Sequence, residues 1–339
     1  MSQDSFFHRY IRNELFFLIR STKQFKSYNI YFLFFVAVLC LKQGSDIMQL
    51  SIITDQINQD FETALQIIHE HGYKYIEIHN VFSKSIEECN DKEVKKIKEL
   101  VQRYEVKVTN IASTIFFLCP LYENDQVTLF NSEFYSIKGN VHTHLRYLEN
   151  ACKIALELDC KRIRVFPFRW PDNRKPPFGT KEDMEIILNN LLLAEKIARN
   201  YGITLVLENC PYSHLPKGKM TLQLVQQINS PYLKLLWDPA NSYRAFKQNV
   251  PLEYQGITLI EELKEVYPYI DHIHVKDYHY VEGFKKPFVH KPIYDGDIDY
   301  DSIFAYLKEQ GYDKALSLEP EVSHKEALLC MKRLQEKTK

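Results

Sequence analysis

The sequence predicts an α/β protein, a single (β/α)₈ TIM barrel preceded by an N-terminal extension. Two observations carry this prediction. From residue 48 onward, short stretches rich in β-branched residues alternate with longer stretches of helical period, the pattern of repeated βα units around a parallel sheet. In addition, acidic residues and a histidine stand at the ends of several short stretches, and a barrel places its chemistry at the carboxyl ends of many strands.

The composition is that of a globular protein. Of the 339 residues, 45% are hydrophobic and 26% are charged, and the formal net charge is −1 at pH 7. This length is enough for one large α/β barrel with a sizeable core. Basic and acidic residues are interspersed, so the one-sided basic face of a nucleic-acid-binding protein is not expected. The seven cysteines are scattered and form no C-x-x-C pair, which indicates free thiols and a cytoplasmic location.

Two parts of the chain are expected. Residues 1–47 form an N-terminal extension, and residues 48–339 form the TIM-barrel catalytic domain, because the first convincing strand begins directly after Met48. The extension contains a short apolar run, 30–41, preceded by basic residues. This run is shorter than the roughly 20 apolar residues that a membrane-spanning helix needs.

Three interpretations of the extension remain open: a start assigned too early, a signal-like or membrane-associated segment, and an extra packed helix. No small-x-small cleavage site follows the apolar run, which argues against a signal peptide. We therefore expect no membrane attachment unless residues 28–42 act as an anchor.

Eight candidate strands follow Met48, each a short apolar stretch bounded by turn residues. They are the ranges 49–54, 75–79, 107–112, 162–167, 204–208, 234–238, 272–276 and 315–319. Amphipathic segments lie between them. In the first, Phe61, Ala64, Leu65 and Ile68 fall on one helical face, which predicts a helix that packs one side on the sheet.

Glycines separate the repeated units. Gly72, Gly202 and Gly311 each stand between a helical segment and the next strand, where a left-handed residue ends a helix. Eight βα units could also form an open doubly wound sheet, but a dinucleotide-binding sheet carries a glycine-rich turn after its first strand. Here the first strand leads into residues 55–58, Asp-Gln-Ile-Asn, and the chain contains no G-x-G-x-x-G. The closed barrel is therefore the prediction.

Four consecutive predicted strands carry potential metal ligands at their carboxyl ends: Glu208, Asp238, His274 and Glu319. A carboxylate at such a position is costly to desolvate unless a cation or hydrogen-bond donors compensate it. Three oxygen ligands and one nitrogen ligand suit one divalent ion, Mn²⁺, Mg²⁺, Co²⁺ or Zn²⁺. For any one of these side chains alone, solvent exposure or a loop hydrogen bond is the better interpretation. Their occurrence in four consecutive strands favours a metal site.

Three further residues are candidates for substrate contacts. His79 ends the second strand, with a loop hydrogen bond as the alternative. Lys276 shares a strand face with His274 and could bind an anionic group as a point charge. Arg169 follows the aromatic end of the fourth strand and could bind a carboxylate or phosphate, although an ordinary packed loop is an equally good interpretation.

Two other polar residues are expected to be structural. Glu77 and His272 lie earlier in their strands than the candidate ligands, so they should sit deeper in the barrel. The long loops 116–139 and 246–256 could cover the site, since long loops on a barrel are often functional.

Four motifs, in this order, resemble the xylose-isomerase-like TIM-barrel superfamily. They are LVLEN at 205–209, WDPAN at 237–241, HIHVKD at 272–277 and the closing stretch 295–321. The resemblance extends from Met48 to about His324. Within the superfamily the chain is most similar to the sugar phosphate isomerase/epimerase group, which includes tagatose and psicose epimerases, hydroxypyruvate isomerase and inosose dehydratase.

The resemblance implies that Glu208, Asp238, His274 and Glu319 ligate one divalent metal ion, and that Glu208 and Glu319 also shuttle protons. It implies an isomerase or epimerase that acts on a sugar or sugar-like ketose through an enediolate. Epimerase relatives often carry histidine where this chain has Asn241, a position that would touch the substrate, so the particular sugar stays open.

Two other functions are compatible with the same site. One is a dehydratase of an inosose or similar keto-polyol, and the other is a non-catalytic sugar-binding barrel. Endonuclease IV, in the same superfamily, needs several additional histidine ligands and a basic face, which this sequence does not show. The expected partner is a small sugar-like molecule, and a homo-oligomer is compatible with the sequence.

Overall fold

The computed structural model describes residues 48–128, 134–245 and 249–339. The expectations for residues 1–47, including a possible membrane anchor, therefore lie outside the described residues. Residues Met48–Lys339 form a unit of their own. Among the helices within the described ranges, none has both the length and the apolar character of a membrane span.

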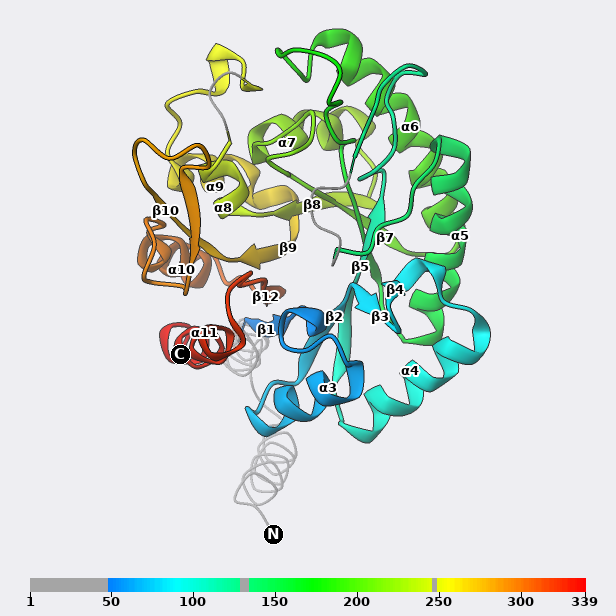
Figure 1. Cartoon of the computed structure of the whole chain (residues 1–339), viewed down its shortest axis with the longest axis vertical. Coiled ribbons are helices and arrows are strands. Elements are labelled where there is room, and N and C mark those ends of the chain that lie inside the picture. Colours follow the sequence, from blue (N-terminus) through cyan, green and yellow to red (C-terminus); the bar gives the residue numbers. More distant parts are fainter. Residues whose placement is uncertain (1–47, 129–133, 246–248) are drawn as a thin grey trace, which may run out of the picture. The chain divides into compact units, whose positions relative to one another are not determined.

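Eight parallel strands form one sheet that curls into a nearly closed barrel (Figure 1). In sheet order they are β1 (Gln49–Ile52), β12 (Ala315–Leu318), β9 (Ile270–Val275), β8 (Leu233–Trp237), β7 (Thr204–Glu208), β6 (Arg162–Val165), β5 (Lys107–Ile115) and β2 (Tyr75–Ile78). A bridge between Ile53 and Glu77 brings the two edge strands together. The predicted (β/α)₈ barrel is confirmed.

The predicted strand ranges differ from the observed ones only at their ends. Strand β7 agrees at both ends, whereas β5 continues beyond residue 112 to Ile115. Strand β6 stops at Val165, short of residue 167. Residue 167 is proline, which has no N–H to donate to a neighbouring strand, so the shorter strand is physically reasonable.

Helices surround the strands (Figure 1). They are α3 (Phe61–Glu70), α4 (Asp91–Arg103), α5 (Val141–Glu157), α6 (Lys181–Asn200), α7 (Gly218–Ile228), α8 (Pro239–Tyr243), α9 (Leu259–Val266), α10 (Tyr300–Glu309) and α11 (His324–Lys337). In α3 the predicted apolar face is buried, with Phe61, Ala64, Leu65 and Ile68 at most 3% exposed. Each amphipathic helix thus covers the barrel with its apolar side.

Short hairpins and 3₁₀ helices lie between the strands and helices of the barrel. Two antiparallel hairpins pair β3 (Asn80–Val81) with β4 (Lys84–Ser85) and β10 (Asp277–Tyr280) with β11 (Phe288–Lys291). Single-turn 3₁₀ helices are η1 (Thr54–Gln56), η2 (Ile86–Glu88), η4 (Leu252–Tyr254) and η5 (Tyr267–Tyr269). Gly72, Gly202 and Gly311 have φ angles of +77°, +66° and +67°, as their predicted role in ending helices requires.

One buried carboxylate fixes the connection after β9. Asp277 accepts backbone N–H groups from Tyr278 at 2.9 Å, Tyr294 at 3.0 Å, Gly296 at 3.1 Å and Ile298 at 3.3 Å. A Cβ atom on Gly296 would lie 2.1 Å from Asp277 Oδ1, so only glycine fits there. The carboxylate therefore ties both ends of the β10–β11 hairpin to the end of β9.

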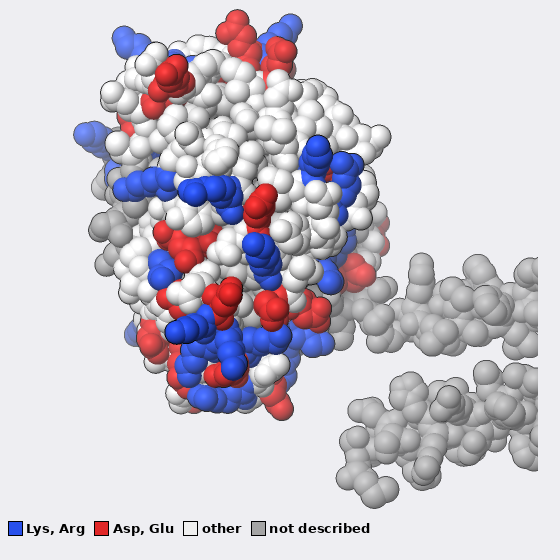
Figure 2. Space-filling model, turned by 90° about the vertical axis from the view of Figure 1, so that its right-hand side faces the viewer, with Lys and Arg blue, Asp and Glu red and all other residues white. Residues whose placement is uncertain are grey.

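The described surface and cysteines agree with the composition. On the face shown in Figure 2, Lys and Arg side chains lie beside Asp and Glu side chains, with large uncharged areas between them.

The six cysteines within the described ranges are buried and unpaired. Burial raises the pKa of Cys89 and of Cys119 to about 12, so both thiols stay protonated.

Asp183 joins three segments at the carboxyl end of the barrel. Its carboxylate accepts the backbone N–H of Thr180 at 3.1 Å, which caps α6, and the hydroxyl of Tyr122 at 2.9 Å. It also lies 3.2 Å from Nδ1 of the buried His214. Burial alone would raise the pKa of Asp183, but these partners, chiefly His214, hold it well below its usual value. The folded state thus favours the charged carboxylate.

We predict that Asp183→Asn lowers the free energy of unfolding by about 2–3 kcal/mol at pH 7, because the charged hydrogen bonds are lost. A pKa that folding depresses contributes stability above the unfolded value of about 4, and this contribution is lost as pH falls. The difference between variant and wild type should therefore shrink below about pH 4. Urea denaturation at pH 7 and at lower pH measures both effects.

The exposed Asp301 provides a matched control, since Asp301→Asn removes a carboxylate that is 72% exposed. This variant should unfold like the wild type at pH 7. Equal stability of wild type and Asp183→Asn at pH 7 would contradict the assignment.

Candidate metal centre and active site

The four predicted metal ligands converge at the carboxyl ends of neighbouring strands. Glu208 ends β7, Asp238 follows β8, His274 lies near the end of β9, and Glu319 follows β12. These strands are adjacent in the sheet in this order. All four side chains are buried, and one ligand atom from each lies within 4.8 Å of the others. The fold brings together residues up to about one third of the chain apart.

The donor set fits a divalent cation. His274 Nδ1 is buried without a hydrogen-bond partner and lies 3.4 Å from Glu319 Oε2 and 3.7 Å from Glu208 Oε1. Three carboxylates in so small a buried space repel each other and are costly to desolvate. Carboxylate oxygens with one imidazole nitrogen are a set that Mn²⁺, Mg²⁺, Co²⁺ or Zn²⁺ accepts.

Two basic side chains balance part of this charge. Lys276 Nζ lies 2.5 Å from Glu319 Oε2 and 3.0 Å from Asp238 Oδ2. Arg164 Nη1 lies 3.2 Å from Glu208 Oε2. The Lys276 ammonium is thus held by two candidate metal ligands, while its contact with an anionic substrate group stays a prediction.

Burial and the neighbouring charges shift the pKa values of Glu319 and Asp238 in opposite directions. Burial alone would raise the pKa of Glu319, but Lys276 and His274 hold it well below its usual value. Burial raises the pKa of Asp238 to about 6, against the opposing effect of Lys276 and with the help of the neighbouring glutamates. A carboxylate that tends to take up a proton near neutral pH indicates a place where further positive charge is favourable.

Glu77 orients His274 from inside the barrel. The Glu77 carboxylate accepts from His272 Nε2 and lies 3.2 and 3.3 Å from His274 Nε2, and Asn110 donates to it at 3.0 Å. With Nε2 engaged by Glu77, the other nitrogen of His274 faces Glu208 and the remaining candidate ligands. Such a carboxylate–histidine pair is the usual support of a metal-ligating imidazole. Glu77 and His272 are both fully buried, as predicted for structural polar residues.

Asn241 positions Glu208. Its side-chain amide donates to Glu208 Oε1 at 3.0 Å and to the backbone carbonyl of Asn209 at 2.9 Å. Its backbone N–H donates to Asp238 Oδ1 at 2.8 Å at the start of α8. Asn241 therefore links two candidate ligands, and it also lines the adjoining cavity.

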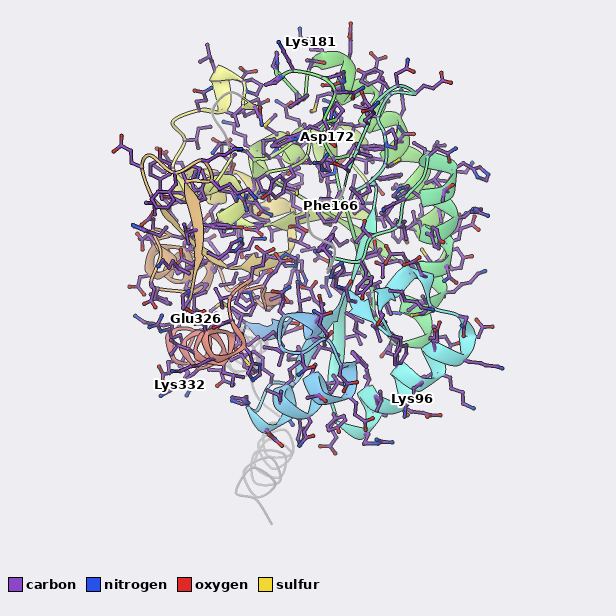
Figure 3. The ribbon with its side chains drawn as sticks, viewed as in Figure 1. Lys96, Phe166, Asp172, Lys181, Glu326 and Lys332 are labelled. Atoms are coloured by element: carbon purple, nitrogen blue, oxygen red, sulfur yellow. The ribbon has the colours of Figure 1, made fainter. Side chains whose placement is uncertain are left out.

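A small cavity adjoins two of the four residues, Glu208 and Glu319. Its volume is about 90 Å³, and Glu208, Glu319 and Lys276 contribute to its polar wall. Phe117 and Phe166 line it on the apolar side. In Figure 3 Phe166 lies near the centre of the ring of strands, whereas labelled residues such as Lys96 lie on the outside. The aromatic end of β6 thus contributes to the pocket.

Two predicted substrate contacts lie elsewhere in the described structure. Arg169 donates to Asp172 at 3.0 Å and to the carbonyl of Trp170 at 3.0 Å. His79 Nδ1 lies 3.2 Å from Asp55 Oδ2, and its ring packs 4.4 Å from that of Phe134. Among the described residues neither contributes to the cavity wall. These contacts fit the packed-loop and hydrogen-bond alternatives, and a substrate contact of either residue stays a prediction.

Sequence reasoning missed the arginines of the site. Arg164 is a charged residue inside a predicted strand, two positions from Arg162, and this alternation could have placed it on the inward face. Arg244 follows α8 in a loop, where no periodic pattern identifies it. It lines the same cavity, together with Tyr212 and Tyr278.

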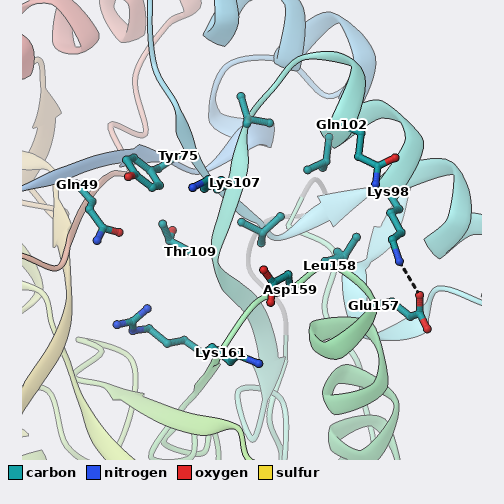
Figure 4. A pocket seen from close by; sticks show the side chains of 14 residues that line it. Gln49, Tyr75, Lys98, Gln102, Lys107, Thr109, Glu157, Leu158, Asp159 and Lys161 are labelled. Atoms are coloured by element: carbon teal, nitrogen blue, oxygen red, sulfur yellow. Dashed lines mark hydrogen bonds and ion pairs between the residues drawn. The ribbon is translucent and has the colours of Figure 1, made fainter. Parts of the chain in front are cut away.

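A larger cavity of about 450 Å³ lies at the opposite end of the barrel (Figure 4). It is lined by residues at the amino ends of strands, including Gln49, Tyr75 and Lys107, and Lys98 and Glu157 form an ion pair of 3.1 Å at it. Barrel enzymes place their chemistry at the carboxyl ends of strands. None of the four candidate ligands borders this cavity, so its size does not make it the active site.

Comparison with known proteins agrees with this fold. A model of the family described as xylose isomerase-like TIM barrel matches residues 65–334. The chain belongs to this family. A relative, the uncharacterized protein MJ1311 of Methanocaldococcus jannaschii, is 26% identical over 267 residues, which is 77% of this chain and 79% of that protein.

Solved structures with a similar fold include enzymes of several kinds. The IolI protein with a bound zinc atom is 18% identical and has a TM-score of 0.62, covering 86% of this chain and 98% of its own. The D-allulose 3-epimerase of Methylomonas sp. in complex with D-allulose has 16% identity, a TM-score of 0.60 and coverages of 86% and 96%. The probable 3-DHS dehydratase AsbF of Bacillus anthracis has 15% identity, a TM-score of 0.60 and coverages of 85% and 99%.

We predict that Glu77→Gln lowers the affinity for Mn²⁺ or Zn²⁺ about 10- to 100-fold, because the amide no longer holds His274 as the carboxylate does. Isothermal titration of the full chain with each metal measures the effect. Glu265→Gln, on the exposed side of α9, is the control and should bind metal like the wild type. Unchanged affinity in a folded Glu77→Gln protein would rule out the orienting role.

Proposed function

We propose that this chain is a divalent-metal-dependent isomerase or epimerase that acts on a sugar or sugar-like ketose, with residues 48–339 as its catalytic domain. The observation that carries the proposal is the buried group of Glu208, Asp238, His274 and Glu319 beside a cavity at the carboxyl end of the barrel. A divalent ion bound there would supply Lewis-acid polarisation of a carbonyl oxygen and its neighbouring hydroxyl. The carboxyl end of the strands is where barrel enzymes have their active sites, which supports the proposal.

Glu208 and Glu319 are the proposed acid–base pair. They stand on β7 and after β12, separated in the sheet by β8 and β9, so they approach the cavity from two sides. One carboxylate removes the proton from the carbon next to the carbonyl, and the other returns a proton to the resulting enediolate. Return to the opposite face of the same carbon gives an epimer, and return to the adjacent carbon gives an isomer.

Other residues of the chain hold this pair in place. Arg164 and Asn241 bond to Glu208, and Lys276 bonds to Glu319, so neither carboxylate is free to turn away. Phe117 and Phe166 give the cavity an apolar wall beside these carboxylates. Held geometry and a dry site are what proton transfer from carbon requires.

Dehydration is the second candidate function. The fold similarity to a probable 3-DHS dehydratase supports it. The same proton removal would then be followed by loss of a β-hydroxyl, which leaves as water after it has taken a proton from the second carboxyl group. A non-catalytic sugar-binding barrel is a third reading, against which the complete donor set argues.

We predict that Glu208→Gln and Glu319→Gln each lower turnover at least about 100-fold while leaving the protein folded, since general acid–base catalysis contributes factors of this order. NMR in D₂O detects the exchange of carbon-bound hydrogen in a panel of ketoses, inososes and hydroxypyruvate. The control Glu265→Gln should exchange like the wild type. If both active-site variants stayed active, the acid–base assignment would fail.

Metal removal gives an independent prediction. The purified full chain should bind one divalent ion, and a chelator should abolish hydrogen exchange, which added Mn²⁺, Mg²⁺, Co²⁺ or Zn²⁺ should restore. Elemental analysis and the same NMR assay measure both. If the folded protein binds no metal, and the ketoses, inososes and hydroxypyruvate show no hydrogen exchange, the non-catalytic sugar-binding role is favoured.

A further inference from the structure

Arg244 is a buried cation held between two aromatic rings. Its guanidinium carbon lies 4.7 Å from the ring centre of Tyr212 and 4.8 Å from that of Tyr278. It donates to the hydroxyl of Tyr278 at 2.8 Å and to that of Tyr212. The side chain is 9% exposed, and its Nε–H is buried without a hydrogen-bond partner.

The partners of Arg244 are neutral. Phenol hydroxyls and ring faces stabilise a guanidinium, but they do not neutralise it. Within the described ranges no carboxylate lies at ion-pair distance from Arg244, although Glu321 accepts from the Tyr278 hydroxyl at 3.2 Å. A buried charge without a direct counter-ion is costly, and Glu321 acts on Arg244 only at longer range, beyond the Tyr278 hydroxyl. The site therefore has unused capacity for an anion.

Arg244 lines the same small cavity as the candidate metal ligands Glu208 and Glu319. Arg164 and Lys276 are already engaged by Glu208 and Glu319. A divalent ion added to these charges would make the site positive overall, since the ion and three basic side chains, Arg244 included, would then face the four carboxylates of Glu208, Asp238, Glu319 and Glu321. An anionic group on the substrate would balance this excess, and Arg244 is the cation left to meet it.

The rings also determine how the guanidinium can be used. Two hydrogen bonds to the tyrosine hydroxyls hold the guanidinium, and its Nε–H, which has no partner, belongs to an edge that suits the planar fork of a carboxylate. The cavity of about 90 Å³ is small beside the roughly 300–1,000 Å³ of ordinary ligand pockets, which favours a compact substrate.

We propose that Arg244 binds a carboxylate of the substrate, so that the chain acts on a small keto or hydroxy acid rather than on a neutral sugar. This inference deepens the proposed function and rests on it for the reaction. It differs from the sequence-based prediction, in which Lys276 and Arg169 were the candidates for an anionic group.

Binding of unreactive analogues tests the proposal without turnover. Glycerol, D-glycerate and glycerol 1-phosphate share three carbons and differ in their neutral, carboxylate or phosphate end. Isothermal titration of each into the Mn²⁺-loaded full chain should show that glycerate binds at least about 10-fold more tightly than glycerol. Arg244→Gln should weaken glycerate roughly 10- to 100-fold, the range for a charged hydrogen-bonded pair, and leave glycerol unchanged.

Two further variants separate recognition from structure. Arg244→Lys keeps the charge but loses the planar fork, so it should bind glycerate several-fold more weakly than the wild type and more tightly than Arg244→Gln. Arg199→Gln, which removes an exposed arginine of α6, is the control and should change nothing. Thermal unfolding checks that each variant is folded.

The outcomes are distinct. No change in glycerate affinity in Arg244→Gln, or an equal loss for glycerol and glycerate, would overturn the proposal, as would Arg244-dependent binding of glycerol 1-phosphate alone. Arg244-dependent glycerate binding without hydrogen exchange in any of the ketoses, the inososes or hydroxypyruvate would uphold this inference and remove the proposed isomerase activity. Hydrogen exchange in neutral ketoses without Arg244-dependent glycerate binding would support the proposed isomerase activity and overturn this inference.

Discussion

The buried negative charge at the carboxyl end of the barrel is the constraint on which the rest of the site depends. Glu208, Asp238 and Glu319 meet within a few ångströms in a place from which water is largely excluded. Such a cluster persists only if cations compensate it. Arg164 and Lys276 supply part of that compensation, and the remainder is the physical reason to expect a bound divalent ion. The imidazole of His274 faces the same carboxylates, and Phe117 and Phe166 line the cavity beside them.

The fold was predictable because its signals are local. A change in hydrophobic period marks each βα unit, and glycines such as Gly72 and Gly202 mark the helix ends, so the eight strands could be located from the sequence. Strand ends were less accurate. Strand β5 continues to Ile115 because its pairing with β6 extends it, and this pairing depends on a strand that lies about fifty residues away along the chain.

The site was predictable only in part. Its four converging residues share one local signature, a polar side chain where an apolar strand ends. Arg244 has no such signature, because a loop residue enters the cavity only through tertiary packing against Tyr212 and Tyr278. For Arg169 the sequence position suggested a binding role, whereas in the structure its guanidinium donates hydrogen bonds to Asp172, three residues later.

The hydrogen bonds of Asp277 affect which sequence changes this barrel can tolerate. Four backbone N–H groups end on one carboxylate, so the hairpin of β10 and β11 is anchored at its base and its outer residues carry little of the fold. Insertions or substitutions at the hairpin tip could then accumulate without disturbing His274 or Lys276 a few residues upstream. Variation at the hairpin tip is thereby uncoupled from preservation of the charges of the candidate metal site.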